Sequence, residues 1–322
     1  SQCLQTPLRW ASFHRKNPQS SRPVTKKFTS LANKMRPAHA VNLSTHRRSR
    51  RVRWFHVPKS GSPFINVLAR FACPSLIGSN VTFVTALNFS MWRNAMRPNC
   101  SGLLAPWQGH TPALTHERAQ GARPALVGLF RTPAQRLLSG FYHTEGGVQG
   151  RMIAPGMSAG ERARMQHAAR GDAGAYARWP GVAGCATKML LGSPCASHRA
   201  LAPQHASMAV HVLQESFAFV GLLEHWAVSV CVFHAIMMRG SPPDDAELVR
   251  THVGSQRRAI SQGSTTTRTA AAAAEHFRYD ERELRGFIDT HDERVYAAAS
   301  TRFWMDARRT RCVPTRTLTP AA

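Results

Sequence analysis

Residues 53–72 read RWFHVPKSGSPFINVLARFA, and this stretch decides the fold. The run at 53–57 is typical of a short buried strand, and 58–62 carries the Pro, Gly and Ser residues of a turn. Pro63 suits the first turn of a helix, where its missing N–H removes no helical hydrogen bond. Apolar residues then recur at helical spacing at Phe64, Val67, Leu68 and Phe71. The stretch therefore predicts a strand, a turn and a helix that ends near residue 72.

A second unit of the same kind spans residues 124–143, PALVGLFRTPAQRLLSGFYH. Its first seven residues form a continuous apolar run, as expected of a parallel strand buried on both faces. Further strands are predicted at 79–86 and 217–221, and further helices at 204–217, 224–238 and 280–308. Strands that alternate with helices predict an α/β fold with a mostly parallel sheet flanked by helices.

The chain has 322 residues, of which 43% are apolar, and this is enough for one large domain with a real core. We expect a basic, poorly ordered arm at 1–50, an α/β domain at 51–312 with a variable insertion at 241–274, and a tail at 313–322. The sequence contains no run of about 18 apolar residues, so no transmembrane helix is predicted. Because the chain begins with Ser, the loss of a membrane anchor from the N-terminus stays open.

Charge is distributed unevenly along the chain, whose formal net charge is +25. Glu117 is the first acidic residue, whereas 17 of the 42 basic residues precede it. Such a basic segment is typical of a disordered arm, a transit-like segment or a polyanion-binding surface. Beyond Lys34 only Lys59 and Lys188 are lysines, which predicts chemistry that needs a compact ammonium group. For Lys188 a surface ion pair is the favoured alternative.

Cysteines and glycosylation sequons favour the secretory pathway. Cys185 and Cys195 are close neighbours, Cys73 and Cys100 flank a hydrophobic stretch, and the odd total leaves one cysteine unpaired if the rest form bridges. The remaining cysteines are Cys3, Cys231 and Cys312. Their spacing does not fit a zinc site. N-x-S/T sequons begin at Asn42, Asn80, Asn88 and Asn99.

The two strand–turn–helix units are candidate phosphate-binding loops, because backbone N–H groups and a positive helix end converge there. The first carries Lys59 among small hydroxyl residues, and the second carries Arg131 in its turn and Ser139 in its helix. The P-loop ATPase motif places its Lys after the glycines, whereas Lys59 precedes Gly61, which disfavours a nucleotide kinase. Two such loops predict a nucleotide with phosphates at both ends.

At these residues the chain resembles sulfotransferases that use 3′-phosphoadenosine 5′-phosphosulfate (PAPS), particularly the Golgi carbohydrate type. The family's 5′-phosphosulfate loop reads like H-x-P-K-x-G-(T/S)-S, and residues 56–63 read HVPKSGSP. Its 3′-phosphate motif reads like R-x-P-x-x-R-L-x-S-x-(Y/F), and residues 131–141 read RTPAQRLLSGF. Stretches at 187–192, 219–224 and 279–303 are also similar, so the resemblance covers about residues 52–305.

The resemblance implies a P-loop-like three-layer sandwich and transfer of a sulfuryl group from PAPS to a hydroxyl of a glycan or similar acceptor. Lys59 would stabilise the bridging oxygen, the loop after it would hold the 5′-phosphate, and Arg131 and Ser139 would hold the 3′-phosphate. The cofactor-binding residues implied are Pro58, Lys59, Ser60, Gly61, Ser62, Pro63, Arg131 and Ser139. No metal is required by this scheme.

A general base is expected to accept the proton of the acceptor hydroxyl, and an imidazole titrates in the useful range. His110 is the first candidate, because uronyl 2-O-sulfotransferases of the family look similar at Gly109-His110 and use that His as base. A structural role for His110 is an equal alternative among 16 histidines. His56 is the second candidate, and His143 with Glu145 is the third.

Three positions depart from the family pattern and motivate a different function. Pro63 stands where Ser or Thr is usual, Leu223 where Thr is common, and Ala186 where Gln is common. Each is expected to weaken nucleotide binding. The alternative is a catalytically impaired protein of this fold that binds polyanions, glycan or nucleic acid, through its basic face. For the enzyme, we expect an anionic carbohydrate partner rather than nucleic acid, and the Golgi lumen as its compartment.

Overall fold

The computed structural model describes residues 52–79, 110, 112–113, 125–145, 157–248 and 278–313. The expected arm at 1–50, most of the strand at 79–86, residues 249–274 of the insertion and nearly all of the tail lie outside these residues. So do the four sequon asparagines.

Among the described residues three parallel strands form the sheet, in the order β1 (Val52–His56), β2 (Ala125–Phe130) and β3 (Phe217–Leu222). Val52 pairs with Ala125 and His56 with Leu129, so β1 and β2 end at the same edge. Every residue of β2 and β3 is buried, which explains their continuous apolar sequences. The predicted α/β fold with a parallel sheet and the strands at 53–57, 124–130 and 217–221 are confirmed.

The predicted helices correspond to α3 (Ile65–Ala72), α5 (Pro133–Glu145), α9 (Pro203–Ser216), α10 (Trp226–Met237) and α14 (Thr290–Arg309). A 3₁₀ turn, η2 (Ser62–Phe64), precedes α3, and another, η6 (Leu223–His225), precedes α10. The region expected to be helical from residue 280 is divided into η7 (Glu281–Leu284) and α14. Positive φ angles at Arg285 and Gly286 end the first piece, and the Asp289 side chain caps the second.

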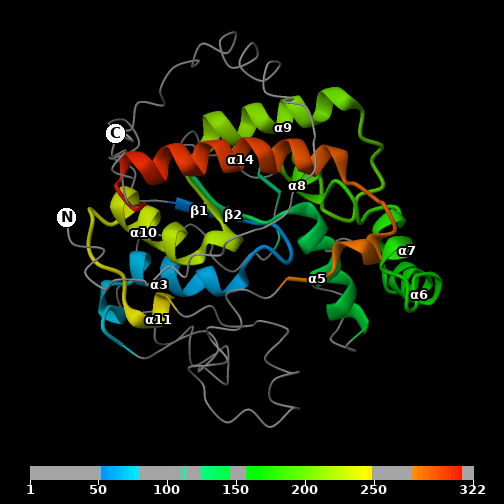
Figure 1. Cartoon of the computed structure of the whole chain (residues 1–322), viewed down its shortest axis with the longest axis horizontal. Helices are drawn as coiled ribbons and strands as arrows, with labels where there is room; N and C mark the ends of the chain where they lie inside the picture. Colours follow the sequence, from blue (N-terminus) through cyan, green and yellow to red (C-terminus); the bar gives the residue numbers. More distant parts are fainter. Residues whose placement is uncertain are drawn as a thin grey trace, which may run out of the picture.

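Helices lie on both sides of the strands in Figure 1, with α9 and α14 on one side and α3 and α10 on the other. α14 buries Val295, Ala299, Phe303 and Ala307, which recur every four residues along one face. On the other side Phe64 of η2 stacks on Phe219 of β3 with ring centroids 5.6 Å apart. The sheet is thus covered by apolar side chains on both faces.

A second apolar cluster lies beside the sheet and joins α5 to α6 (Ala159–Ala168) and α7 (Ala173–Arg178). Leu138 and Phe141 of α5 contribute to it, together with Met165 and Tyr176. These helices account for the helical pieces expected within 145–182. The cluster anchors the helix that follows the second candidate phosphate loop.

The stretch expected to be an insertion begins with a packed helix, α11 (Asp245–Leu248). Its Glu247 is buried and lies 3.2 Å from His234 Nε2 on α10. The preceding Asp244 accepts a hydrogen bond from Arg70 of α3 at 2.8 Å. Residues 241–248 are therefore tied to the domain core.

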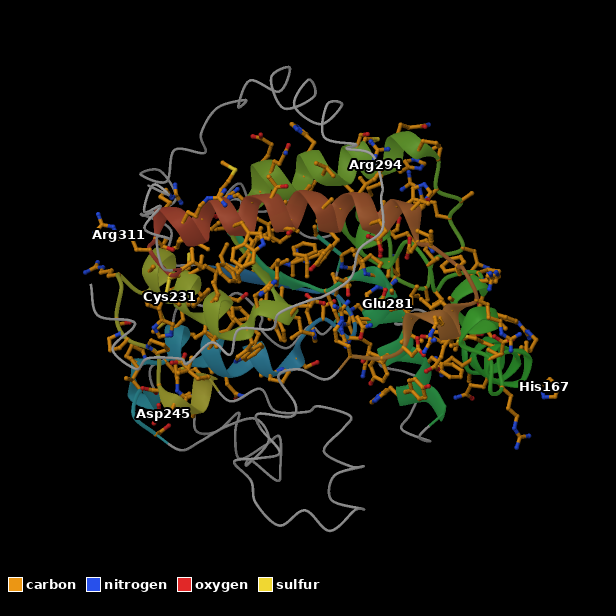
Figure 2. The ribbon with its side chains drawn as sticks, viewed as in Figure 1. His167, Cys231, Asp245, Glu281, Arg294 and Arg311 are labelled. Carbon is orange, nitrogen blue, oxygen red and sulfur yellow. A yellow bond between two sulfur atoms is a disulfide. The ribbon has the colours of Figure 1, made fainter. Side chains whose placement is uncertain are left out.

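Two disulfides, Cys185–Cys195 and Cys231–Cys312, cross-link the domain. The first joins Cys185, the first residue of α8 (Cys185–Leu190), to Cys195 beyond the end of that helix, and the second joins α10, where Figure 2 labels Cys231, to the residues just after α14. Cys73 is likewise disulfide-bonded, and Cys3 and Cys100 lie outside the described residues. Disulfides are typical of an oxidising, secretory compartment. Within the described part of the chain, every helix is too short or too polar to cross a bilayer.

Candidate functional site

The two candidate phosphate loops meet at the carboxyl ends of β1 and β2. Parallel neighbouring strands place the turns that follow them side by side, where open α/β sheets usually bind ligands. Arg131, just after β2, donates a hydrogen bond from Nη1 to the carbonyl oxygen of Lys59, just after β1, at 3.2 Å. The structure therefore brings together two residues that the sequence predicted for the same site.

The loop after β1 is bent by two residues with positive φ, Lys59 at 66° and Gly61 at 99°. A Cβ at Gly61 would lie 2.9 Å from Leu129 Cδ1 and 3.0 Å from Leu223 Cδ1, so only glycine fits without movement. Ser60 N–H donates to Val57 O at 3.2 Å and thereby closes the turn. Among the described residues the N–H groups of Gly61 and Ser62 have no hydrogen-bond partner, so these two amides are available to an anion.

Among the described residues, Lys59 has no carboxylate partner that compensates its charge. Burial, and then the neighbouring Arg131 guanidinium, lower the pKa of Lys59 to about 8. Both effects disfavour the charged ammonium. An anion bound here would reverse them, because it would pair with Lys59 and Arg131 together. A strongly perturbed lysine next to available amides is a feature of ligand sites.

His110 and His56 lie against each other beside this loop, with ring centroids 4.4 Å apart. His110 Nδ1 is 2.9 Å from the carbonyl oxygen of His56. A carbonyl oxygen only accepts, so Nδ1 carries the proton of the neutral imidazole and Nε2 keeps its lone pair. Burial lowers the pKa of His110, and the nearby charge of Lys59 lowers it further, whereas this hydrogen bond opposes the shift. His110 is therefore neutral near pH 7 and offers Nε2 as a proton acceptor.

His56 is more deeply buried and its ring is already engaged. Its Nε2 lies 3.3 Å from Ser62 Oγ, and Trp54 stacks on it at 4.0 Å. Burial, followed by His110 and Lys59, lowers the pKa of His56 well below its ordinary value. The third candidate, His143, lies ten residues beyond Pro133 on α5, a rise of about 15 Å. The side chain of Glu145 lies outside the described residues.

The turn after β2 is hydrogen-bonded to the carboxylate of Glu224, a residue of η6. Glu224 Oε1 accepts from Thr132 N at 2.9 Å and from Thr132 Oγ1 at 3.2 Å, and thus caps the start of α5. Tyr296 of α14 donates to the other carboxylate oxygen at 3.4 Å. Ser139, predicted to hold the 3′-phosphate, is 8% exposed on α5 and would need to become more accessible to contact a ligand.

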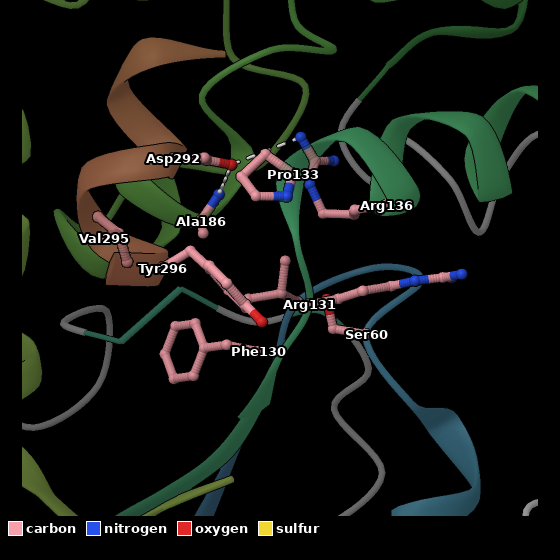
Figure 3. A pocket seen from close by; sticks show the side chains of 10 residues that line it. Ser60, Phe130, Arg131, Pro133, Arg136, Ala186, Asp292, Val295 and Tyr296 are labelled. Atoms are coloured by element: carbon pink, nitrogen blue, oxygen red, sulfur yellow. Dashed lines mark hydrogen bonds and ion pairs between the residues drawn. The ribbon is translucent and has the colours of Figure 1, made fainter. Parts of the chain in front are cut away.

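Arg136, the second arginine of this motif, is a structural residue that the sequence reasoning missed. It is 6% exposed and ion-paired through Nη2 with Asp289 at 3.3 Å and Asp292 at 3.4 Å. Asp292 also accepts from the Ala186 N–H at the start of α8, as the dashed lines in Figure 3 show. Burial and Asp292 raise the pKa of Asp289, and Arg136 opposes this shift. Two acids three residues apart at a helix start were the only sequence signal of the network.

A cavity of about 10 Å³ separates the two loops from α14, and its lining includes Ser60, Arg136, Ala186 and Tyr296. Figure 3 shows these side chains, with Arg131 extending away from Tyr296. The cavity has room for about one water molecule, so a nucleotide would have to lie outside it. Within the described part of the chain, the buried Ser60 hydroxyl has no hydrogen-bond partner.

Three further residues singled out in the sequence, Pro63, Leu223 and Lys188, also lie among the described residues. Pro63 is buried in η2, and Leu223 contacts the Gly61 side of the loop. Lys188 is 4% exposed on α8, so the surface ion pair favoured for it is wrong. Burial lowers the pKa of Lys188, and the Asp292 and Asp289 carboxylates oppose the shift. Among the described residues no cluster of His, Cys, Asp or Glu is arranged to hold a metal ion.

No protein-family model, curated protein or solved structure matches this chain. The function of the chain is therefore inferred from the site geometry and from the two loop motifs.

Proposed function

We propose that this chain is a PAPS-dependent sulfotransferase of the Golgi carbohydrate type with a P-loop-like three-layer sandwich fold. The observation that carries the proposal is the hydrogen bond of 3.2 Å between Arg131 and the Lys59 carbonyl, which joins the two loops. A nucleotide with phosphates at both ends could place one phosphate at each of two neighbouring loops.

The loop residues fit the donor substrate. The Gly61 and Ser62 amides and the Ser62 hydroxyl would bind the 5′-phosphate, and Ser60 would support the turn through its own N–H. Lys59 would neutralise the charge that develops on the bridging oxygen, a role in which a fixed cation in a desolvated site is most effective. Arg131, with Ser139 once accessible, would bind the 3′-phosphate and so select against nucleotides that lack it.

His110 is the proposed general base. Its Nε2 would take the proton of the acceptor hydroxyl as that oxygen bonds to sulfur and the bond from sulfur to the phosphate oxygen breaks. The leaving oxygen keeps the electron pair, and Lys59 balances its charge. Because the pKa of His110 is lowered from its ordinary value, more of the imidazole is unprotonated at a given pH than in a free histidine. The acid limb of the activity profile should therefore lie below pH 6.5, the ordinary pKa of histidine.

Charge and cysteine usage support the proposed acceptor and compartment. A net charge of +25 favours an anionic carbohydrate over a neutral one. The two disulfides are consistent with a secretory lumen.

The decisive experiment is a thermal-shift titration with adenosine 3′,5′-bisphosphate (PAP), the product of PAPS, with ADP as control. Ligand at one hundred times its Kd should stabilise the folded protein by about 2.7 kcal/mol. We expect a shift with PAP and a much smaller one with ADP, followed by PAPS-dependent sulfation of an acidic glycan. A folded protein that responds to neither nucleotide contradicts the proposal.

The polyanion-binding alternative is favoured by one detail of the first loop. Leu129 and Leu223 pack against Gly61, and Pro63 offers no N–H, so the loop has fewer polar contacts than the family pattern implies. This alternative predicts no response to PAP and binding to heparin that weakens steeply as salt rises. A measured PAP affinity in the micromolar range would exclude it.

A further inference from the structure

A buried glutamine attaches the segment at 278–284 to α5, directly beside Arg131. Gln135 is 2% exposed and makes three hydrogen bonds to this segment. Its Nε2 donates to Tyr279 O at 3.0 Å and to Glu281 Oε1 at 2.9 Å, and its Oε1 accepts from Tyr279 N at 2.9 Å. Figure 2 labels Glu281 in this segment. The side-chain amide thus holds both backbone polar groups of Tyr279.

Only an amide side chain of this length can make these contacts. A carboxylate cannot donate, and a methionine can neither donate nor accept strongly. Because Gln135 is buried, losing its bonds would also leave backbone groups of Tyr279 without these partners. The position of Tyr279 therefore depends on the identity of residue 135.

The Tyr279 ring in turn contacts Arg131. The guanidinium carbon of Arg131 lies 5.9 Å from the ring centroid, within the range of a cation–π contact. On the Tyr142 side the two tyrosine rings stack with centroids 5.0 Å apart and planes 12° apart. Tyr142 also donates a hydrogen bond to Glu283 in the same segment. Arg131 is thus oriented by an aromatic ring as well as by the Lys59 carbonyl.

We infer that Gln135 and Tyr279 are positioning residues that orient Arg131 and thereby set the preference of this site for nucleotides with a 3′-phosphate. The inference rests on the proposed function and extends it to residues that need not touch the phosphate. It assigns a role to the 278–284 segment, whose similarity to the family carried no role by itself.

The test compares the affinities of PAP and AMP, which differ only in the 3′-phosphate, by titration calorimetry on the whole chain. Tyr279→Leu should lower the PAP-over-AMP preference about three- to fivefold, the size of an exposed cation–π contact. Tyr279→Phe keeps the ring and should retain the preference. Gln135→Met should lower it about tenfold, because the segment loses all three bonds. AMP affinity should stay unchanged in every variant.

Arg282→Ala is the matched control, because it removes an exposed ion pair with Asp280 in the same segment and leaves Gln135 intact. Equal losses of PAP and AMP affinity would show a merely structural role and overturn the inference. A Tyr279→Leu variant that keeps the wild-type preference for PAP over AMP would also overturn the inference, even if Gln135→Met fails to fold. A wild-type protein that does not prefer PAP over AMP contradicts the proposed function itself, and the inference with it.

Discussion

The loops after β1 and β2 have the same strand–turn–helix design, but they differ in how far the protein itself supplies partners for their charged and polar groups. The β2 turn is completed by the protein's own acids, since Glu224 caps α5 and Asp289 with Asp292 pairs with Arg136. The β1 loop has a desolvated Lys59, two available amides, two residues with positive φ and a buried hydroxyl without a partner among the described residues. Within the described part of the chain, the β2 turn and α5 have internal carboxylate partners, whereas Lys59 of the β1 loop has none.

This difference suggests that, within one site, some residues serve ligand binding and others serve the stability of the fold. Burying a cation without a partner costs free energy, and sites tolerate the cost when a ligand offsets it. The β1 loop is therefore expected to control ligand binding and chemistry, whereas Arg136 and Glu224 hold α5 in place. Substitutions in the two loops can test this division.

The largest stability effect is expected for Arg136→Met. The substitution leaves two buried carboxylates without their cation, which should lower the free energy of unfolding by about 3–5 kcal/mol. Urea denaturation at pH 7 measures this change. Arg282→Ala, at an exposed ion pair, should have no measurable effect. A stable Arg136→Met variant would show that the β2 turn does not depend on its internal ion pairs.

Lys59→Ala should greatly slow catalysis without weakening the fold. Loss of the charge at the bridging oxygen is expected to lower the rate of sulfuryl transfer by about 10²–10³-fold, the effect of removing a comparable oxyanion donor. The melting temperature should be unchanged or higher, because a desolvated cation is removed. Rates of sulfate transfer from PAPS and a thermal melt on the same sample provide both readouts. Wild-type activity in this variant would refute the role of Lys59.

Stability should rise with pH above neutrality because of Lys59. An unfolded lysine keeps its proton to about pH 10.4, whereas folded Lys59 loses it near its pKa of about 8. Between these values the unfolded state binds more protons, so the free energy of unfolding should rise by about 2–3 kcal/mol from pH 8 to pH 10. Denaturation curves of wild type and Lys59→Met measure the difference. The same rise in Lys59→Met would assign it to another group.

The smallest effect is expected for Glu224→Ala, which removes the carboxylate from the Thr132 N–H and hydroxyl. Loss of such a helix cap should lower the free energy of unfolding by about 1–2 kcal/mol. Glu224→Gln keeps Oε1 as an acceptor and should lose less. Urea denaturation of the two variants compares them. If Glu224→Gln lowers the free energy of unfolding as much as Glu224→Ala does, the charge matters more than the hydrogen bonds.

Much of the fold was readable from local sequence, but several contacts of the site were not. The strands at 124–130 and 217–221 are continuous apolar runs, and the turns after the strands at 53–57 and 124–130 carry Pro, Gly or Ser. By contrast, Arg136 and Asp289 are 153 positions apart, and Gln135 and Tyr279 are 144 apart. No local pattern distinguishes Arg136, which is buried and ion-paired, from Arg131, which lies beside Lys59.

The sequence by itself determined the parallel α/β sheet, the two strand–turn–helix units and Lys59 as the residue to test. It could do so because strand burial, turn chemistry and helical periodicity are short-range properties of the chain. Only the tertiary structure decided that Arg131 bonds to the Lys59 loop, that Glu224 caps α5 and that Gln135 holds Tyr279 over Arg131. These contacts join distant segments, and the packing of helices against the sheet determines which side chains meet.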